Sequence, residues 1–293
     1  MAITITIANE KGGVGKTTTA VNVAAGLALR LREKFGDQSN TTSVEAKKSV
    51  NGRVLLVDMD PQTHALLATA FRQTQQTPPS NLAALLTESP PPSIQPLIQP
   101  ADHHDNLFFL PSSRGAMVEA ARILPTLMAN ETRLATALAS IQSQFTYIII
   151  DTPPTTGDLL INALVAASYV LVPVETSYLG VSGLRELQRT IDQVRMHFRP
   201  DLRILGYLPT LCDEHRSEAQ DILVELNQRY PGQVLPPIHK SSDLAYAHSS
   251  HMDVFTYRPP RQRRDGQIAS SSRPTQEYAE LVETILQLTQ VKP

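Results

Sequence analysis

Residues 3–18 read ITITIANEKGGVGKTT. The first five alternate between isoleucine and threonine, which is typical of a β-strand. Glycines then stand at positions 12, 13 and 15, and Lys16 follows the last of them. Because such glycines let backbone N–H groups close around phosphate oxygens, the segment predicts a strand, a phosphate-binding loop and a helix in that order. Lys16 is then expected to reach the β and γ phosphates of a nucleotide.

Two further features point to the same triphosphate. The hydroxyl of Thr17 is suited to Mg²⁺, and a helix beginning near Thr18 turns the positive end of its dipole toward the phosphates. A lone glycine-rich turn with a lysine is often only a flexible loop, but a strand and a helix flank this one, which favours nucleotide binding. The residues of this loop expected to contact the nucleotide are Gly12, Gly13, Val14, Gly15, Lys16, Thr17 and Thr18.

The usual first glycine of such a loop is absent, because Glu10 stands in its place and a second lysine, Lys11, follows. This deviant form of the loop resembles that of the ParA, Soj and MinD group of P-loop ATPases. The resemblance implies that ATP is the nucleotide and Mg²⁺ its ion. It also implies that Lys11 crosses a dimer interface to the partner's nucleotide, and so acts in dimerisation and, with Lys16, in catalysis.

A second motif follows residues 54–57 (VLLV), a continuous apolar run typical of a strand buried on both faces. The run ends in DMDPQ at 58–62, and carboxylates at this end of a parallel strand face the ligand crevice. The pattern is similar to the second nucleotide motif of the same family. That similarity implies that Asp60 orients the attacking water and that Asp58 supports the Mg²⁺ and the loop.

A third motif is carried by residues 147–154 (YIIIDTPP), a buried apolar strand that delivers Asp151. By resemblance to the family, Asp151 binds the Mg²⁺ and its waters, together with Thr17; such an acid holds the metal that neutralises developing charge in phosphoryl transfer. Residues 204–210 predict a further strand, and the resemblance implies that its end, at Thr210, lies beside the adenine.

Composition limits the remaining possibilities. Lysine and arginine total 26 against 28 acids, so the formal net charge of −2 creates no general attraction to nucleic acid, and DNA binding requires a local patch. The single cysteine, Cys212, excludes an intramolecular disulfide and a four-cysteine zinc site within one chain. No signal peptide and no membrane-length apolar run is evident, so we expect a cytoplasmic protein without a membrane partner.

The predicted fold is α/β: a doubly wound, mostly parallel sheet flanked by helices, of the deviant P-loop type. At 293 residues, the chain is expected to form one domain over 1–293. A polar stretch at about 32–53 predicts an exposed insertion, and the proline-rich stretch at about 77–100 predicts connecting structure around one short helix. A helix is expected over 117–138 with a break near Pro125, and another over 276–288.

The chain departs from the family at residues 238–247 (IHKSSDLAYA). Partition ATPases of this kind often carry Pro-Arg-Asn-Val-Arg-Leu-x-Glu-Ala there; Lys240 stands at one arginine position and Asp243 at another, where a carboxylate repels DNA phosphates. Other cations must then compensate, although a solvated arginine loop is the alternative. The candidate DNA-binding residues are Arg229, Lys240, Arg258, Arg261, Arg263 and Arg264.

Together the three motifs resemble those of ParA/Soj-like partition ATPases. The resemblance implies an ATP-bound homodimer that binds non-specific double-stranded DNA on the nucleoid and is released when a ParB-like or cargo-adaptor partner stimulates hydrolysis. The cargo would be a plasmid, a chromosome or a protein assembly. Two alternatives remain: a MinD-like membrane-positioning ATPase, which predicts a basic amphipathic C-terminal helix that this acidic tail lacks, and a metabolic enzyme with the same loop. An iron–sulfur reductase needs more cysteines than Cys212.

Overall fold

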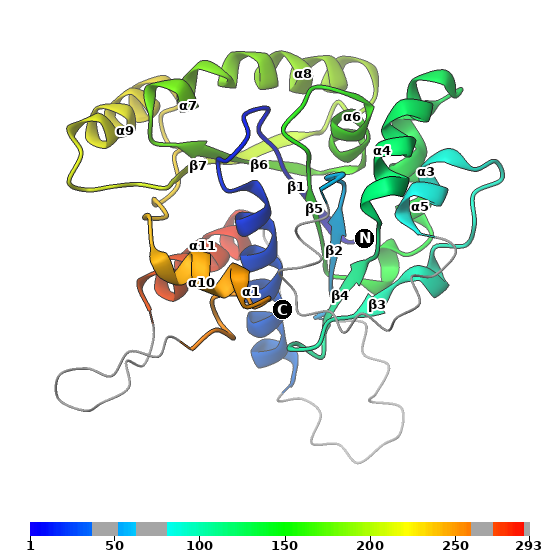
Figure 1. Ribbon diagram of the computed structural model, residues 1–293, viewed down its shortest axis with the longest axis horizontal. Coiled ribbons are helices and arrows are strands. Elements are labelled where there is room, and N and C mark those ends of the chain that lie inside the picture. Colours follow the sequence, from blue (N-terminus) through cyan, green and yellow to red (C-terminus); the bar gives the residue numbers. More distant parts are fainter. Residues whose placement is uncertain (37–51, 63–80, 259–271, 290–293) are drawn as a thin grey trace.

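A computed structural model describes residues 1–36, 52–62, 81–258 and 272–289. Within these residues seven strands form one sheet in the order β3-β4-β2-β5-β1-β6-β7, and only the β3–β4 pair is antiparallel. The mostly parallel sheet predicted from the sequence is confirmed (Figure 1). The strands are β1 (Ile3–Ile7), β2 (Val54–Asp58), β3 (Gln99–Pro100), β4 (Leu107–Leu110), β5 (Tyr147–Asp151), β6 (Tyr169–Glu175) and β7 (Arg203–Thr210).

Helices cover both faces of the sheet, because alternate residues of its buried strands point to opposite sides. Leu56 and Ile149 pack in one core with α1 and α11, whereas Leu55 and Ile148 pack in another with α3 to α6. The α-helices are α1 (Lys16–Gly36), α3 (Leu82–Thr87), α4 (Arg114–Ile123), α5 (Arg133–Ala139), α6 (Asp158–Ala166), α7 (Tyr178–Ser182), α8 (Leu184–His197), α9 (Ser217–Arg229), α10 (Ser242–Ser249) and α11 (Arg273–Leu288). Single 3-10 turns are η3 (Gln95–Leu97), η4 (Leu124–Thr126), η5 (Asn130–Thr132) and η6 (Gln142–Gln144).

The predicted insertion at 32–53 begins too early. Helix α1 continues to Gly36, because Leu31 is fully buried and Phe35, one turn later, packs against the same core. Polar composition at 32–34 therefore marks only the exposed face of the last turns. Residues 37–51 lie outside the described part of the chain.

The proline-rich connection contains more structure than predicted. Helix α3 agrees with the expected short helix, but Gln99–Pro100 also adds an antiparallel edge strand to β4, a place where proline is tolerated because no neighbour needs its missing N–H. The expected helix over 117–138 is divided as predicted: α4 ends before η4, which contains Pro125, and α5 follows. The last helix begins at Arg273, earlier than expected.

The register of the central strands positions the site. Asp151, at the end of β5, pairs with Ile7 of β1 on one side and with Asp58 of β2 on the other. The chain segments that follow these three residues therefore leave the sheet at the same edge. This register brings the three sequence motifs together in space.

Candidate nucleotide site

The loop between β1 and α1 has the conformation that its glycines allow. Gly13 and Gly15 have φ values of 76° and 83°, in the left-handed region where a side chain is strained. Helix α1 begins directly after them, and the Thr19 N–H donates to the Gly15 carbonyl at 2.8 Å. The loop therefore opens onto the N-terminus of a long helix, which is an anion-binding arrangement.

Lys16 is nearly buried, and its Nζ donates to the carbonyl oxygen of Lys11 at 2.8 Å, across the loop. Burial lowers the pKa of Lys16, while the nearby carboxylates of Asp151 and Asp60 act in the opposite direction. A cation held in this partly desolvated setting interacts strongly with an incoming anion. The position matches the phosphate-contacting role expected of Lys16, which no comparison tests.

The Thr17 hydroxyl donates to Asp151 Oδ2 at 2.7 Å. Burial raises the pKa of Asp151 to about 7; the hydrogen bond from Thr17 lowers it, the charge of Asp60 raises it, and the charge of Lys16 lowers it. A hydroxyl and a carboxylate are hard oxygen donors, so this pair fits Mg²⁺. No cluster of three or more His, Cys, Asp or Glu ligands occurs in the described residues, which suits an ion held mainly by phosphates and water.

The second motif forms a turn that its own side chains stabilise. Asp58 Oδ1 accepts the Asp60 N–H at 3.0 Å, and Asp60 Oδ1 accepts the Gln62 N–H at 2.9 Å. Asp58 is buried, whereas Asp60 and Gln62 line the cavity described next. Asp58 thus fixes the backbone from which Asp60 projects, in agreement with a supporting rather than a contacting position.

A cavity of about 640 Å³ is lined at one end by residues of the loop and of the second motif: Gly12, Gly13, Gly15, Lys16, Thr17, Thr18, Asp60 and Gln62. The other end is lined by segments far away in the sequence, and Figure 1 shows their elements, α10 and α11, beside α1. The large residues there are Leu211, Ile238, Lys240, Leu244, His248 and Tyr278. Of this part of the cavity, sequence reasoning identified only Thr210 as a nucleotide contact; Lys240 was predicted to bind DNA, and no motif in α10 or α11 marks the wall.

Thr210 lines the cavity, but its hydroxyl is already hydrogen-bonded to the protein backbone. It donates to the Val14 carbonyl at 2.9 Å and so ties the end of β7 to the phosphate loop. Tyr278 lies on the opposite wall, with its hydroxyl 3.5 Å from Thr19 Oγ1, and burial raises its pKa to about 12. The tyrosine is therefore neutral and helps to join α11 to α1.

Lys11 does not line the cavity. Its Nζ donates to Glu175 Oε2 at 2.5 Å and to Ser177 Oγ at 3.5 Å. Asn9, fully buried, anchors the same region: its Nδ2 donates to the Pro173 carbonyl at 2.7 Å and its Oδ1 accepts the Lys11 N–H at 3.0 Å. Sequence reasoning missed both Asn9 and Glu175. The available signal for Glu175 was the polar run of residues 175–178 that begins at the end of β6.

The candidate DNA-binding cations are only partly brought together. Arg229 ends α9 and lies over Tyr230, which stacks on Tyr207 within β7, whereas Lys240 lies beyond the end of that strand and lines the cavity. Arg258 donates to the Phe255 carbonyl. Arg261, Arg263 and Arg264 lie outside the described residues.

Asp243, at one of the family's arginine positions, lies at the start of α10. Its side chain is 9% exposed in the first turn of α10, and its N–H is bonded to the Ser241 cap. A carboxylate there interacts favourably with the helix N-terminus. The Asp243 side chain is therefore largely buried at the start of α10, and its expected repulsion of DNA phosphates stays a prediction. None of the described helices is long and apolar enough to span a bilayer.

Comparisons with known proteins agree with this geometry. A family model described as an AAA domain matches residues 2–204. The chromosome partitioning protein ParA of Myxococcus xanthus is 37% identical over 236 residues, 80% of this chain and 74% of that protein. The sporulation initiation inhibitor protein Soj of Bacillus subtilis is 32% identical over 259 residues, 87% of this chain and 91% of that protein.

Among solved structures, cobyrinic acid a,c-diamide synthase from Mycobacterium smegmatis, with a bound ATP analogue and magnesium, is similar with a TM-score of 0.73. The identity is 27%, over 99% of this chain and 97% of that one. The matched family model covers the phosphate loop and all three motifs, and the ParA and Soj relatives extend the match over most of the chain. The chain therefore belongs to the ParA/Soj family of partition ATPases, within the ParA/MinD superfamily of P-loop proteins.

Proposed function

We propose that this chain hydrolyses ATP to ADP and phosphate with Mg²⁺, dimerises when ATP binds, and as a dimer binds double-stranded DNA without sequence preference. It would act on the nucleoid in the cytoplasm, and segregate or position a plasmid, a chromosome or a large protein cargo. The observation that carries the proposal is the meeting of Lys16, Thr17 and Asp60 at one end of a cavity, with the buried Asp151 bonded to Thr17 behind them.

The chemistry follows from the charges at that end. Loop N–H groups and Lys16 bind the phosphates, and Asp60, which lines the cavity, orients the attacking water. Thr17 and Asp151 would hold Mg²⁺, which neutralises charge developing on the transferred phosphoryl group when it is bound. Because Lys16 and Asp151 are buried, their charges are little screened by solvent.

The pairing of Lys11 with Glu175 bears on dimerisation. To contact a partner's phosphates, the Lys11 side chain must leave Glu175 of its own chain. Both side chains are partly exposed, at 27% and 31%, so the pair is weak enough to exchange for a triphosphate with a higher charge. In this proposal the partner's triphosphate replaces Glu175 as the anion bound to Lys11. Dimerisation would therefore depend on ATP.

DNA binding in this proposal uses the family resemblance together with the available cations: Arg229, Lys240, Arg258, Arg261, Arg263 and Arg264. They would contact phosphates and carry no sequence information. A ParB-like or cargo-adaptor protein would stimulate hydrolysis by completing the transition-state site, and so release the dimer from DNA.

The decisive experiment measures binding to unrelated duplex DNA at fixed salt with ATP, with ADP and without nucleotide, for the wild type and for Lys11→Ala. Salt is fixed because phosphate contacts weaken steeply as it rises. We expect binding with ATP alone, and its loss in Lys11→Ala. If ATP is hydrolysed but no nucleotide state binds DNA, the partition proposal fails.

A second candidate function is an ATP-dependent metabolic enzyme. The likeness to cobyrinic acid a,c-diamide synthase over 99% of this chain favours it. The extension of the cavity beyond its phosphate-binding end favours it as well. Incubation with ATP, glutamine and carboxylic acids, followed by mass spectrometry, separates the two: amidated products support the enzyme, and ADP without such products supports the partition ATPase.

A further inference from the structure

Asn9 is a fully buried asparagine between strand β1 and the phosphate loop. The backbone ladder from β1 to β6 ends where the Ala8 N–H donates to the Leu171 carbonyl at 3.1 Å. The next β6 carbonyl that faces the same side, that of Pro173, accepts Asn9 Nδ2 at 2.7 Å instead. Because a side chain replaces the backbone donor there, the main chain can leave the sheet without leaving this buried carbonyl unpaired. Asn9 thus ends the ladder and begins the loop.

The same side chain fixes the first turn of the loop. Asn9 Oδ1 accepts the Lys11 N–H at 3.0 Å, and the Lys11 carbonyl accepts Lys16 Nζ at 2.8 Å. A hydrogen bond from an asparagine side chain to the N–H two residues later is a tight turn that this residue type favours. The Lys16 ammonium is therefore joined to β6 through Lys11 and Asn9.

Strand β6 also holds the Lys11 side chain, but through a different residue. Glu175, two residues after Pro173, accepts Lys11 Nζ and is 31% exposed. The bond from Asn9 to the Lys11 N–H has a fully buried side chain on one side. The more exposed contact can open while the buried one holds, so the Lys11 side chain can turn outward without moving the carbonyl that Lys16 uses.

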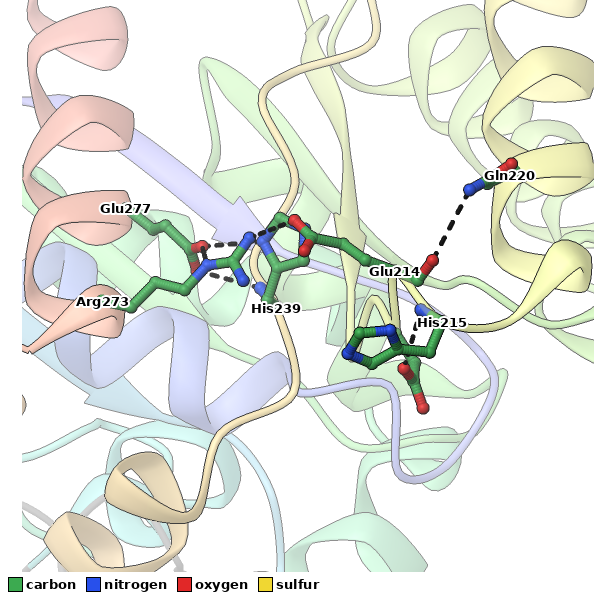
Figure 2. Close-up of polar contacts among 7 residues, drawn as sticks. Glu214, His215, Gln220, His239, Arg273 and Glu277 are labelled. Carbon is green, nitrogen blue, oxygen red and sulfur yellow. Dashed lines mark hydrogen bonds and ion pairs between the residues drawn. The ribbon is translucent and has the colours of Figure 1, made fainter.

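Figure 2 shows, for contrast, polar contacts whose side chains reach solvent. There His239 lies 3.0 Å from Glu214 through Nε2 and 2.7 Å from Glu277 through Nδ1, and so joins the loop after β7 to α11. Arg273 contacts Glu214 at 2.5 Å, and these two side chains are 52% and 56% exposed. Water and salt weaken exposed contacts, so they restrain their neighbours less than the buried bonds of Asn9 do.

We propose that Asn9 is a positioning residue for Lys16. It holds the Lys11 peptide, and through the Lys11 carbonyl the Lys16 ammonium, in one place both when the Lys11 side chain is bound to Glu175 and when it is released. The inference rests on the proposed binding of ATP, in which Lys16 contacts the phosphates. Its consequence is that a subunit can offer Lys11 to a partner and keep its own phosphate site intact.

The test measures binding of MgADP and of magnesium tripolyphosphate to the full chain by calorimetry at fixed pH and salt. MgADP does not drive the proposed dimerisation, and tripolyphosphate lacks the base, so together they report on the phosphate-binding end of the cavity. Asn9→Ala removes both side-chain hydrogen bonds. Asn162→Ala is the matched control: Asn162 is equally buried, but it lies in α6, accepts the Leu134 N–H and donates to the Asn130 carbonyl.

We expect Asn9→Ala to weaken both ligands about three- to tenfold, as for the loss of about one hydrogen bond, and Asn162→Ala to leave both unchanged. In a Lys16→Ala background, Asn9→Ala should weaken MgADP no further, because the effects of residues that act through one another are not additive. A loss of equal size in the wild-type and Lys16→Ala backgrounds overturns the proposal, since Asn9 would then not act through Lys16.

Glu175→Gln tests the separation of the two lysines. It weakens the hold on the Lys11 side chain and leaves the bond from Asn9 to the Lys11 N–H in place, so the affinity for MgADP should stay within about twofold of the wild type. A loss as large as that of Asn9→Ala would mean that the Lys11 side chain, and not Asn9, holds the Lys11 carbonyl, and would contradict the proposal.

The two levels of the argument fail differently. If neither ligand binds to the wild type, the proposed function fails and the inference with it; if both bind and Asn9→Ala binds them as tightly, only the inference fails. Should Asn9→Ala unfold, Asn9→Ser serves instead, because a serine hydroxyl can bond to the Lys11 N–H but is too short to reach the Pro173 carbonyl as well. Asn9→Ser should weaken both ligands in the wild-type background only, and an equal loss in the Lys16→Ala background contradicts the inference.

Discussion

The two ends of the cavity are built differently: the phosphate end lies at the loop after β1, and the other end, where the proposed function places the base, is called the base end below. At the phosphate end, three short motifs converge because β1, β5 and β2 are neighbours in register and finish at one edge of the sheet. At the base end, the wall comes from the end of β7, residues 238–241, α10 and α11, which are joined by side-chain contacts across long stretches of sequence. The first end depends on strand order, and the second depends on how helices pack.

This difference predicts different sensitivities. Phosphate binding uses backbone N–H groups and a few charges, so it should survive changes in helix packing but not the loss of a charge. The base end is lined largely by apolar side chains, so small shifts of α11 should weaken the proposed binding of the base while phosphate binding persists. Five substitutions test the site, in order of decreasing expected effect.

Lys16→Ala should have the largest effect. Removing the buried cation at the phosphate end should lower kcat/KM for ATP roughly 1000-fold, whereas Leu244→Ala at the base end should cost about tenfold. Steady-state phosphate release measures both. Lys34→Ala, at the other end of α1, is the control. Equal losses in Lys16→Ala and Leu244→Ala would remove the distinction between the two ends.

Asp151→Asn tests the cost of the buried carboxylate. Burial raises the pKa of Asp151 to about 7 from an ordinary 3.8, so without metal the folded chain keeps a proton that the unfolded chain has already lost. The free energy of unfolding therefore falls as pH rises from about 4 to about 7, and is level above that. Asp151→Asn should remove this slope and, in EDTA at about pH 8, raise stability by on the order of 2 kcal/mol.

Urea unfolding at several pH values measures this change, and hydrolysis should be lost in the same variant. The exposed Asp201→Asn serves as the control and should leave the slope in place. A slope that is unaltered in Asp151→Asn would show that another group is responsible for it.

Gly26→Ala perturbs the base end alone. A Cβ there would lie 2.7 Å from the Val282 side chain of α11 and 2.9 Å from the Phe255 ring, so these side chains must shift, and we expect α11 to shift with Val282. We expect a loss of about 1–3 kcal/mol in stability and weaker ATP binding, with tripolyphosphate binding unchanged. Gly115→Ala, in helix α4 with open space around it, is the matched control and should be neutral or slightly stabilising. Equal weakening of both ligands would mean that the two ends are not separable.

Glu175→Gln should have the smallest effect, and of the opposite sign. It weakens the hold on Lys11 within its own chain, so dimer formation at a given ATP concentration should increase about two- to fivefold, in keeping with a partly exposed ion pair. Analytical ultracentrifugation with a slowly hydrolysed ATP analogue measures it. Glu225→Gln, exposed on α9, controls for the change of net charge. A reduced dimer fraction would assign Glu175 to the interface itself.

The sequence was sufficient for the central strands and the phosphate end because their signals are local, but it did not predict the edge strand β3. Alternating or continuous apolar runs predicted β1, β2, β5 and β7, and glycine spacing predicted the loop whose Gly13 and Gly15 adopt positive φ. The prediction failed where polarity was taken for absence of structure: α1 continues to Gly36 because two apolar residues, one turn apart, decide its last turns.

The sequence by itself identified the four polar residues of the phosphate end, which are Lys16, Thr17, Asp60 and Asp151. Each of them follows a glycine pattern or an apolar run, and such patterns specify the local backbone conformation. Only the tertiary structure decided that Thr210 bonds to Val14, that Lys11 rests on Glu175, and that His239 joins the loop after β7 to α11. Those contacts link residues 25 to 196 positions apart, and no local periodicity encodes which distant side chains will meet once the helices have packed.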